Sequence, residues 1–466
     1  MSQSTAPRLA FQIRSLHRHW DRDPEFGLGE ILSAKQLQLL LTEEGADGTR
    51  CLYTPVLTFW AFLWQVLSPD RSCQSAVARL QAWLSSRGRP PCPSDTSPYC
   101  KARQRLPEAV PLRLARQLGR DLHRQAAPRW RWCGRSVKLV DGTTVSMPDT
   151  AANQAAYPQN PAQAPGLGFP LARMVVLFCL ATGAVLDAAI GRYQGKGTSE
   201  VALFRSLWDG LDEGDVILGD RFFGSYFALA MLQQRGIDGV FRLHQRRITD
   251  YRRGRRLGRT DHVVTWQRPQ RPDWMDRATY EQSPEALEVR EMRVQVAQKG
   301  FRTRSLEIVT TLLDAQVYTK QDISTLYRMR WHAELDLRSI KVVLGVDVLR
   351  CKTPEMVRKE LWMSLVGYNV IRALMGDAAR AHGKEPRKLS FKGALQILTE
   401  YAEQLRSAKG EGRRRLRADV LRAIAGLGVG DRPDRIEPRA RKRRPKPYPL
   451  LMKPRKQAKA ALLKAG

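Results

Sequence analysis

The sequence predicts a mixed α/β fold, because three kinds of segment follow one another along its 466 residues. Residues 1–130 show helical patterns, strand-like and helical segments alternate from about residue 135, and a basic, β-rich segment interrupts the alternation at about 245–304. Strands that alternate with helices indicate a mixed α/β core. A chain of this length is expected to form roughly two to four structural units.

Helical patterns fill the first 130 residues. Thr54 and Pro55 are residue types that cap and begin helices, and the apolar run over 56–67 that follows predicts a buried helix. Apolar residues within 76–84 recur at helical spacing and stop before Gly88, which predicts a second helix with a defined end. We therefore expect a helical N-terminal domain.

A basic segment near residue 100 leaves two interpretations open. It carries Lys101, Arg103 and Arg105. These cations could contact phosphates as part of a small helical DNA-binding unit. They could equally lie on a helix face that only solvent covers.

The alternating part of the chain begins with a short apolar strand that runs into Asp141. Strand patterns and helical patterns then follow in turn, and the strands are bounded by Gly-containing turns. We predict strands at 137–140, 174–180, 184–186, 215–218, 239–241 and 306–313, with helices at about 199–208, 225–234, 322–343 and 355–375.

The segment at 245–304 combines arginines with a strand-like run at 262–266, so we interpret it as an inserted, basic, β-rich module. Its candidates for DNA contact are Arg252, Arg253, Arg255 and Arg256. Residues 376–430 are expected to form a helical C-terminal segment. Residues 431–466 are rich in Pro, Lys and Arg, so we predict a disordered basic tail.

Composition points to a polyanionic partner. Lys and Arg number 78 against 46 Asp and Glu, which gives a formal net charge of +32 and favours nucleic acid over a small metabolite. The 7 cysteines show no spacing typical of a zinc finger or a disulfide framework. No apolar stretch is long enough to span a membrane, so we expect a soluble bacterial protein of the cytoplasm and nucleoid, with no membrane partner.

Two aspartates follow predicted buried strands. Asp141 comes after 137–140, and Asp220 comes after 215–218 and Gly219. Functional side chains collect at strand ends in α/β sheets. Taken alone, each aspartate could equally be a turn former or a helix cap.

A third acid lies in the helical pattern at 322–343. At roughly 100° per residue, Tyr327, Arg330, Glu334 and Lys341 fall within about 60° of one another, so they share one polar face. The alternative is an exposed stripe of ordinary surface ion pairs.

Three carboxylates brought together repel one another unless cations neutralise them. Carboxylate oxygens suit Mg²⁺ or Mn²⁺. Two such ions can activate a water or a 3′-hydroxyl and stabilise the leaving oxygen, while nearby Arg and Lys neutralise phosphate charge. Asp141, Asp220 and Glu334 are therefore candidates for metal-dependent phosphodiester chemistry.

These residues resemble a known family. Tyr327, Arg330, Glu334 and Lys341 match in identity and spacing the YREK signature of the insertion sequence 4 family of DDE transposases. The segments 141–143 and 219–222 resemble the first and second aspartate motifs of that family, and 194–200 is also similar to it. The likeness covers about 135–375.

The resemblance implies an RNase H-like catalytic core over 131–375, interrupted by a β-rich insertion, with Asp141, Asp220 and Glu334 as catalytic ligands of Mg²⁺ or Mn²⁺. It implies a cut-and-paste transposase that nicks element ends and joins the 3′-hydroxyl to target DNA. The partners would be double-stranded DNA and, when two ends are paired, a second copy in a homodimer. Residues implied to contact DNA or phosphate are Tyr327, Arg330, Trp331 and Lys341.

Some members of this family hold a flipped base with a tryptophan of the inserted module. Trp266 or Trp274 could do so here, because base–aromatic stacking contributes roughly 1–3 kcal/mol. The alternative is a tryptophan that packs within the module. Two other functions also remain open, namely a nuclease that cuts without joining and a catalytically silent DNA-binding protein derived from a transposase.

Overall fold

A computed structural model describes residues 28, 31–46, 52–86, 88–295, 305–430 and 449–465. The chain divides into two compact units. The first, which we call the helical unit, comprises Met1–Gln125, Ala184–Leu186 and Arg338–Val429. The second, the sheet unit, comprises Ala126–Gly183, Asp187–Leu337 and Gly430–Gly466. The helical unit thus combines segments from both ends of the chain.

The helical unit is built around one long buried helix, α13, which packs against α3, α6, α14 and α15. Asn369 of α13 binds the backbone of Val185 through both its amide oxygen and its amide nitrogen, at 2.8 Å each. The helices of the unit are α2 (Ala34–Glu43), α3 (Pro55–Leu67), α4 (Cys73–Ser86), α5 (Ser97–Arg105), α6 (Ala109–Arg124), η3 (Ser339–Val343), α13 (Pro354–Ala381), η4 (Pro386–Lys388), α14 (Phe391–Ser407) and α15 (Gly410–Gly426).

The two predicted N-terminal helices are confirmed. Thr54 caps α3 by accepting a hydrogen bond from the Leu57 amide at 3.2 Å, and α4 is followed by Gly88 with a φ of +66°. The basic segment near residue 100 forms α5, but Arg103 is buried and donates to Gln65 at 3.2 Å. A buried guanidinium held by its own fold is not presented to DNA, so Arg103 is removed from the candidate contacts.

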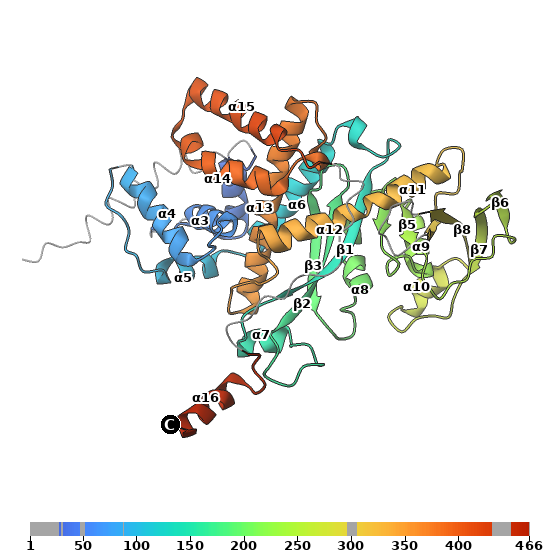
Figure 1. Cartoon of the computed structure of the whole chain (residues 1–466), viewed down its shortest axis with the longest axis horizontal. Helices are drawn as coiled ribbons and strands as arrows, with labels where there is room; N and C mark the ends of the chain where they lie inside the picture. The colour runs from blue at the N-terminus through green and yellow to red at the C-terminus, as the bar shows by residue number, and fades with distance from the viewer. Residues whose placement is uncertain are drawn as a thin grey trace, which may run out of the picture. The chain divides into compact units, whose positions relative to one another are not determined.

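A nine-stranded sheet forms the sheet unit within the part of the chain that the structure describes (Figure 1). Its strand order is β3-β2-β1-β4-β5-β9-β8-β7-β6. The strands are β1 (Val137–Ser146), β2 (Leu171–Cys179), β3 (Val185–Arg192), β4 (Val216–Gly219), β5 (Asp238–Arg242), β6 (Arg255–Gly258), β7 (Asp261–Gln267), β8 (Ala286–Gln295) and β9 (Ser305–Thr310). The mixed α/β prediction is confirmed.

Helices accompany the strands in chain order. Ser199 and Ser225 cap α8 and α9, as their positions before apolar helical runs predict. The helices of the sheet unit are η1 (Pro128–Trp130), α7 (Ala151–Ala156), α8 (Glu200–Arg205), η2 (Trp208–Gly210), α9 (Tyr226–Gln233), α10 (Arg277–Gln282), α11 (Lys320–Met329), α12 (Trp331–Arg338) and α16 (Arg455–Ala465).

The middle of the sheet combines both strand directions. β1 pairs with β2 in antiparallel and with β4 in parallel, and β4 pairs with β5 in parallel. Of β1, only Val137–Leu139 pair with β4, whereas the pairing of β1 with β2 continues to Ser146. Asp141 therefore lies within β1 and not past its end, because the antiparallel partner extends the strand. Asp220 follows β4 directly, as predicted.

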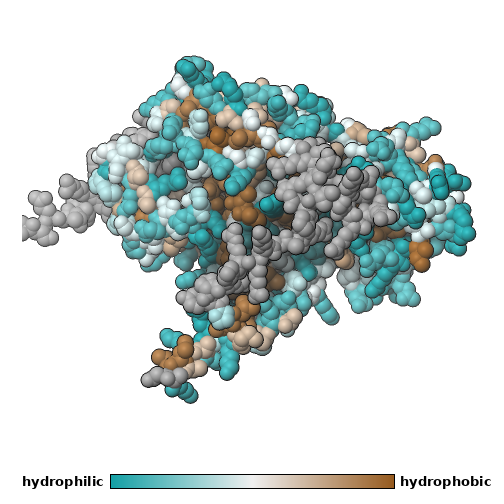
Figure 2. Space-filling view, in the orientation of Figure 1, coloured by the Kyte–Doolittle hydropathy of each residue, from teal (hydrophilic) through white to brown (hydrophobic). Residues whose placement is uncertain are grey.

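The β-rich insertion continues the same sheet. β9 pairs with β5 on one side and β8 on the other, and β7 and β6 complete that edge. Buried Arg290 of β8 donates to both carboxylate oxygens of Asp261 on β7, at 2.8 and 2.6 Å. Figure 2 shows mostly hydrophilic side chains on the visible face around β6, β7 and β8. Residues 296–304 of the predicted insertion lie outside the described residues.

The basic tail differs from the prediction at its end. Residues 455–465 form the exposed helix α16, while 431–448 lie outside the described residues. Ala, Leu, Lys and Gln dominate α16, and their high helix propensity explains a helix without a buried face. Among the described residues, no helix is both long and apolar enough to cross a membrane.

Candidate active site

Asp141 and Asp220 lie on neighbouring strands of the sheet. β4 ends at Gly219, so β1 loses its parallel partner just before Asp141. Asp141 accepts a hydrogen bond from the Gly142 amide at 2.8 Å, and Asp220 accepts one from the Phe222 amide at 2.8 Å. Each aspartate is thus held by the backbone just after it.

Glu334 comes from the helical segment over residues 320–338. α11 ends at Met329, Arg330 keeps a helical conformation, and α12 begins at Trp331, so the two helices run almost in line across the sheet (Figure 1). Arg330 forms a salt bridge with Glu334, four residues further along, at 2.7 Å. Tyr327 on the preceding turn is buried. Tyr327, Arg330 and Glu334 therefore gather as the sequence spacing predicts.

The electrostatics connect this helix to the two aspartates. Burial raises the pKa of Asp141 to about 6; the Gly142 amide and Arg330 oppose the rise, and the charges of Asp220 and Glu334 add to it. Asp141 therefore lies within electrostatic reach of the two other candidate metal ligands, Asp220 and Glu334. Burial and two like charges disfavour the ionisation of this acid, and a bound cation would relieve both effects.

Two arginines that the sequence analysis did not select extend this group. Burial lowers the pKa of Arg242 at the end of β5, and the positive charges of Arg221 and Arg330 lower it further, whereas Tyr327 and Asp220 raise it. Arg242 thus lies within electrostatic reach of two other guanidinium groups and of Asp220. The rule that pointed to Asp220 also applies to Arg242, because it ends the next parallel strand.

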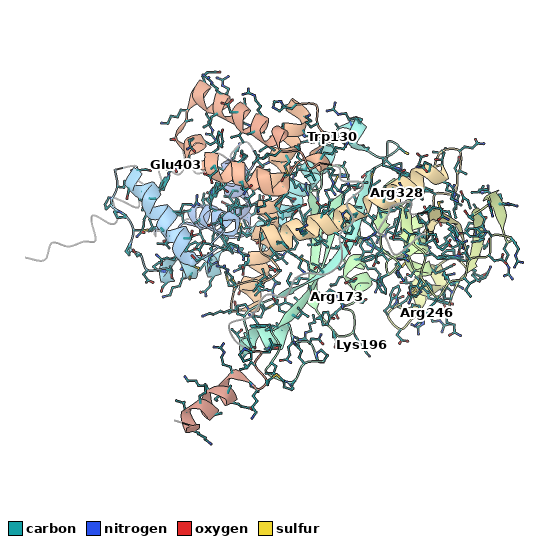
Figure 3. All side chains as sticks on the ribbon, in the orientation of Figure 1. Trp130, Arg173, Lys196, Arg246, Arg328 and Glu403 are labelled. Atoms are coloured by element: carbon teal, nitrogen blue, oxygen red, sulfur yellow. The ribbon has the colours of Figure 1, made fainter. Side chains whose placement is uncertain are left out.

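Glu200, the first residue of α8, was also missed as a site residue. Burial raises its pKa, Arg173 opposes the rise, and Asp220 adds to it. Figure 3 labels Arg173 on β2 and Lys196 in the loop before α8. Only packing brings Glu200 to this place, although the segment 194–200 resembles the family.

Lys341 departs from the predicted helix face. It lies in the π-helical turn η3, where the Leu344 amide donates to the Ser339 carbonyl five residues back at 3.0 Å. A π-helical turn holds more residues than an α-helical turn, so the spacing of 100° per residue does not extend to Lys341. Lys341 also belongs to the helical unit, whereas Tyr327, Arg330 and Glu334 belong to the sheet unit.

The three candidate tryptophans differ in exposure. Trp266 is 5% exposed, its indole N–H donates to Glu291 at 2.8 Å, and the Arg247 guanidinium lies 3.5 Å from its ring centre. Trp274 is 46% exposed, with the Arg205 guanidinium 3.7 Å from its ring centre. Trp331 is exposed on α12. Trp266 therefore packs within the module and does not offer a ring face to a base.

The four arginines proposed for DNA contact lie at the start of the insertion, and all are exposed. Arg252 and Arg253 share Asp250, at 2.9 and 3.5 Å. Arg255 and Arg256 lie on β6 at the edge of the sheet. Their exposure leaves them accessible to a polyanion.

The three candidate metal ligands do not form a metal site among the described residues, where no group of three or more His, Cys, Asp or Glu side chains lies close enough to hold a metal ion. Glu334 is instead paired with Arg330. The chemistry of the donors nevertheless fits Mg²⁺ or Mn²⁺, because every acid near Asp141 offers carboxylate oxygens. A cation would compete with Arg330 for Glu334.

Comparison with known proteins places the chain among transposases. Residues 132–370, just over half of the chain, match the family model described as a transposase DDE domain. The chain is 28% identical to the transposase InsG for insertion sequence element IS4 of Escherichia coli strain K12, over 93% of this chain and 95% of that protein. It is also similar to a cryo-EM structure of the piggyBac transposase synaptic complex with hairpin DNA, at 11% identity, a TM-score of 0.43 and coverage of 86% of this chain and 85% of that one, a likeness too weak to support an argument.

Proposed function

Because the chain belongs to the DDE transposase family, and within it to the insertion sequence 4 group, we propose that it moves an insertion sequence by a cut-and-paste reaction on DNA. It would nick the ends of the element and join the freed 3′-hydroxyl to target DNA. The observation that carries the proposal is that the half-buried carboxylate of Asp141 lies within electrostatic reach of Asp220, Glu334 and Arg330.

In this proposal Asp141, Asp220 and Glu334 hold divalent cations, Mg²⁺ or Mn²⁺. When bound, such ions activate the attacking oxygen and stabilise the leaving oxygen. The raised pKa of Asp141 supports the assignment, because an ion would neutralise charge that is costly to bury. The order β3-β2-β1-β4-β5, antiparallel between β2 and β1 and parallel from β1 to β5, supports an RNase H-like core.

The cationic residues of the site would hold the DNA. Arg330, Arg242 and Arg221 supply guanidinium groups that can bind phosphate oxygens in pairs of hydrogen bonds. Arg330 would exchange Glu334 for a phosphate when Glu334 binds a cation. Tyr327 and Lys341 are assigned to phosphate positioning by the resemblance alone. Two element ends must be brought together for joining, so the active form would be a homodimer on paired ends.

The test replaces each carboxylate by its amide. Asp141→Asn, Asp220→Asn and Glu334→Gln keep the shape of the side chain but remove the charge that a cation needs. We expect each variant to bind element ends and to lose nicking and strand transfer by on the order of 10³-fold or more. The measurement is the rate of both steps on labelled end DNA in Mg²⁺.

Asp209→Asn is the matched control, because the Asp209 side chain is fully exposed, at 100%, on η2 of the same unit. It should react at the parent rate. Cleavage by Glu334→Gln near the parent rate would contradict the assignment. If the parent nicks DNA without strand transfer, a nuclease is favoured. If the parent carries out neither step, a silent DNA-binding protein is favoured.

A further inference from the structure

Glu200 occupies a position that the three-carboxylate assignment does not explain. It begins α8, the helix that precedes β4 in the chain, and Ser199 caps that helix by accepting from the Ala202 amide at 3.2 Å. The cap fixes where the first side chain of the helix starts. Glu200 is therefore placed by local structure and not by a flexible loop.

Its carboxyl group lies against the residue that follows Asp141. A Cβ atom added to Gly142 would meet the Glu200 Cδ at 2.5 Å and Oε1 at 2.6 Å. The space that a side chain at 142 would need is thus filled by the Glu200 carboxyl group. Glycine at 142 lets this group approach the backbone of β1 one residue after Asp141, and its charge interacts with that of Asp220.

The Glu200 carboxylate is poorly neutralised by the protein. Its nearest cation is the Arg173 Nε, at 4.0 Å, and the side chain is only 33% exposed. Arg173, which is labelled in Figure 3, also uses its Nη1 to donate to the Thr198 carbonyl at 2.9 Å. Within the described chain, no hydrogen bond to the Glu200 side chain accompanies this ion pair. A carboxylate that is partly removed from water is ordinarily paired or hydrogen-bonded, because desolvation of a charge is costly.

We propose that Glu200 is a fourth acidic residue of the active site, a positioning residue that helps Asp141 and Asp220 retain the divalent cations. It acts from the α8 side of β1, through its negative charge and through the water that a hydrated cation carries. The inference rests on the proposed function. It adds an acid that neither the YREK signature nor the two aspartate motifs contains.

The first test measures cation binding without DNA. We expect Glu200→Gln to weaken Mn²⁺ binding about 10-fold, measured on the full chain by electron paramagnetic resonance, because residues that support metal ligands change metal affinity by 10-fold to 100-fold. The Mg²⁺ concentration for half-maximal nicking should rise by a similar factor, and the rate at saturating Mg²⁺ should largely recover. Glu200→Asp should keep more of the affinity than Glu200→Gln. Glu213→Gln, in the turn before β4, is the matched control and should bind Mn²⁺ like the parent.

A second test uses Gly142. Gly142→Ala should displace the Glu200 carboxyl group and weaken Mn²⁺ binding to the same extent, and the Gly142→Ala/Glu200→Gln double variant should bind no more weakly than either single variant. Losses that add in the double variant would overturn the proposal. The proposal would also be overturned if Glu200→Gln bound Mn²⁺ as tightly as the parent while Asp220→Asn bound it more weakly. The proposed function would then stand. If Asp141→Asn and Asp220→Asn also bound Mn²⁺ as tightly as the parent, both the role of Glu200 and the proposed function would be overturned.

Discussion

Two charged side chains lie three residues apart on strand β1, buried Lys138 and half-buried Asp141, and the protein treats them in opposite ways. Lys138 is 1% exposed, and its ammonium group contacts Asp215 at 2.5 Å, Asp212 at 3.0 Å and the Gly210 carbonyl at 3.0 Å. Asp141 has one backbone amide at 2.8 Å and the influence of Arg330, while two further acids lie within reach.

This difference separates a structural charge from a functional one. A buried ion that is paired and hydrogen-bonded on several sides holds its neighbours in place. A half-buried acid with few partners costs stability, and the cost is useful where a cation or substrate is to bind. On the same strand, the charge of Lys138 is neutralised by the protein, whereas that of Asp141 is neutralised only in part.

The largest expected effect comes from removing the charge of Lys138. Lys138→Met leaves Asp215 buried without its cation, so we expect a loss of about 3–5 kcal/mol in the free energy of unfolding of the sheet unit. Denaturant unfolding followed by fluorescence measures this loss. Lys196→Met, at an exposed lysine of the same unit, should be neutral. Equal stability of the two variants would show that Lys138 is not structural.

The opposite sign is expected at Asp141. Because its folded pKa of about 6 lies above the ordinary value of 3.8, the folded state binds the proton more tightly, and stability should fall as pH rises from about 4 to about 6. Asp141→Asn should therefore be more stable than the parent at pH 7 in chelator, by on the order of 3 kcal/mol in the free energy of unfolding. Its stability should also lose this pH dependence. A variant less stable than the parent would contradict the view of Asp141 as an under-neutralised acid.

The tryptophans extend the comparison to neutral side chains. Trp266 is enclosed by its own contacts, so Trp266→Phe should lower stability without selecting one reaction step. Trp274 is partly exposed. If it holds a base, Trp274→Ala should raise the activation free energy of the second-strand step by about 1 kcal/mol, the lower end of the stacking range. Gels that separate nicked from fully cut ends measure this. A stronger step-specific defect in Trp266→Phe would reverse the assignment.

The exposed arginines should have the smallest individual effects. Removing Arg255 or Arg256 should reduce the slope of log affinity against log salt by about 0.9 for each phosphate that the variant no longer neutralises. Asp250→Asn should steepen the slope, because it releases Arg252 and Arg253 from their shared partner. Titrations of fluorescent DNA at several salt concentrations distinguish these outcomes. Unchanged slopes would place the DNA elsewhere.

How far the sequence could predict the site depended on whether local structure or packing decides each position. Asp220 was predictable because a short buried strand and a Gly-Asp turn place it. Arg330 and Glu334 were predictable because helical spacing does. The position of Asp141 within β1 depended on pairing with β2, and that of Lys341 on a π-helical turn.

Tertiary packing decides the remaining features. The sequence makes Trp266 a candidate for base stacking because it is a tryptophan of the inserted module. Only its contacts with Glu291 and Arg247 show that it is enclosed. Glu200 begins an ordinary helix, and only its approach to Gly142 brings it to β1. The end of the tail forms α16 through helix propensity, which its overall charge and proline content obscured.

The most direct test of the central claim, that Asp141, Asp220 and Glu334 hold the catalytic cations, changes the ligand atom. In Asp220→Cys a thiolate replaces a carboxylate, and Mn²⁺ accepts sulfur more readily than Mg²⁺ does. The measurement is the rate of end nicking in each ion, divided by the parent rate in the same ion. We predict almost no activity in Mg²⁺ and partial recovery in Mn²⁺. The same relative rate in both ions would contradict direct metal binding by Asp220.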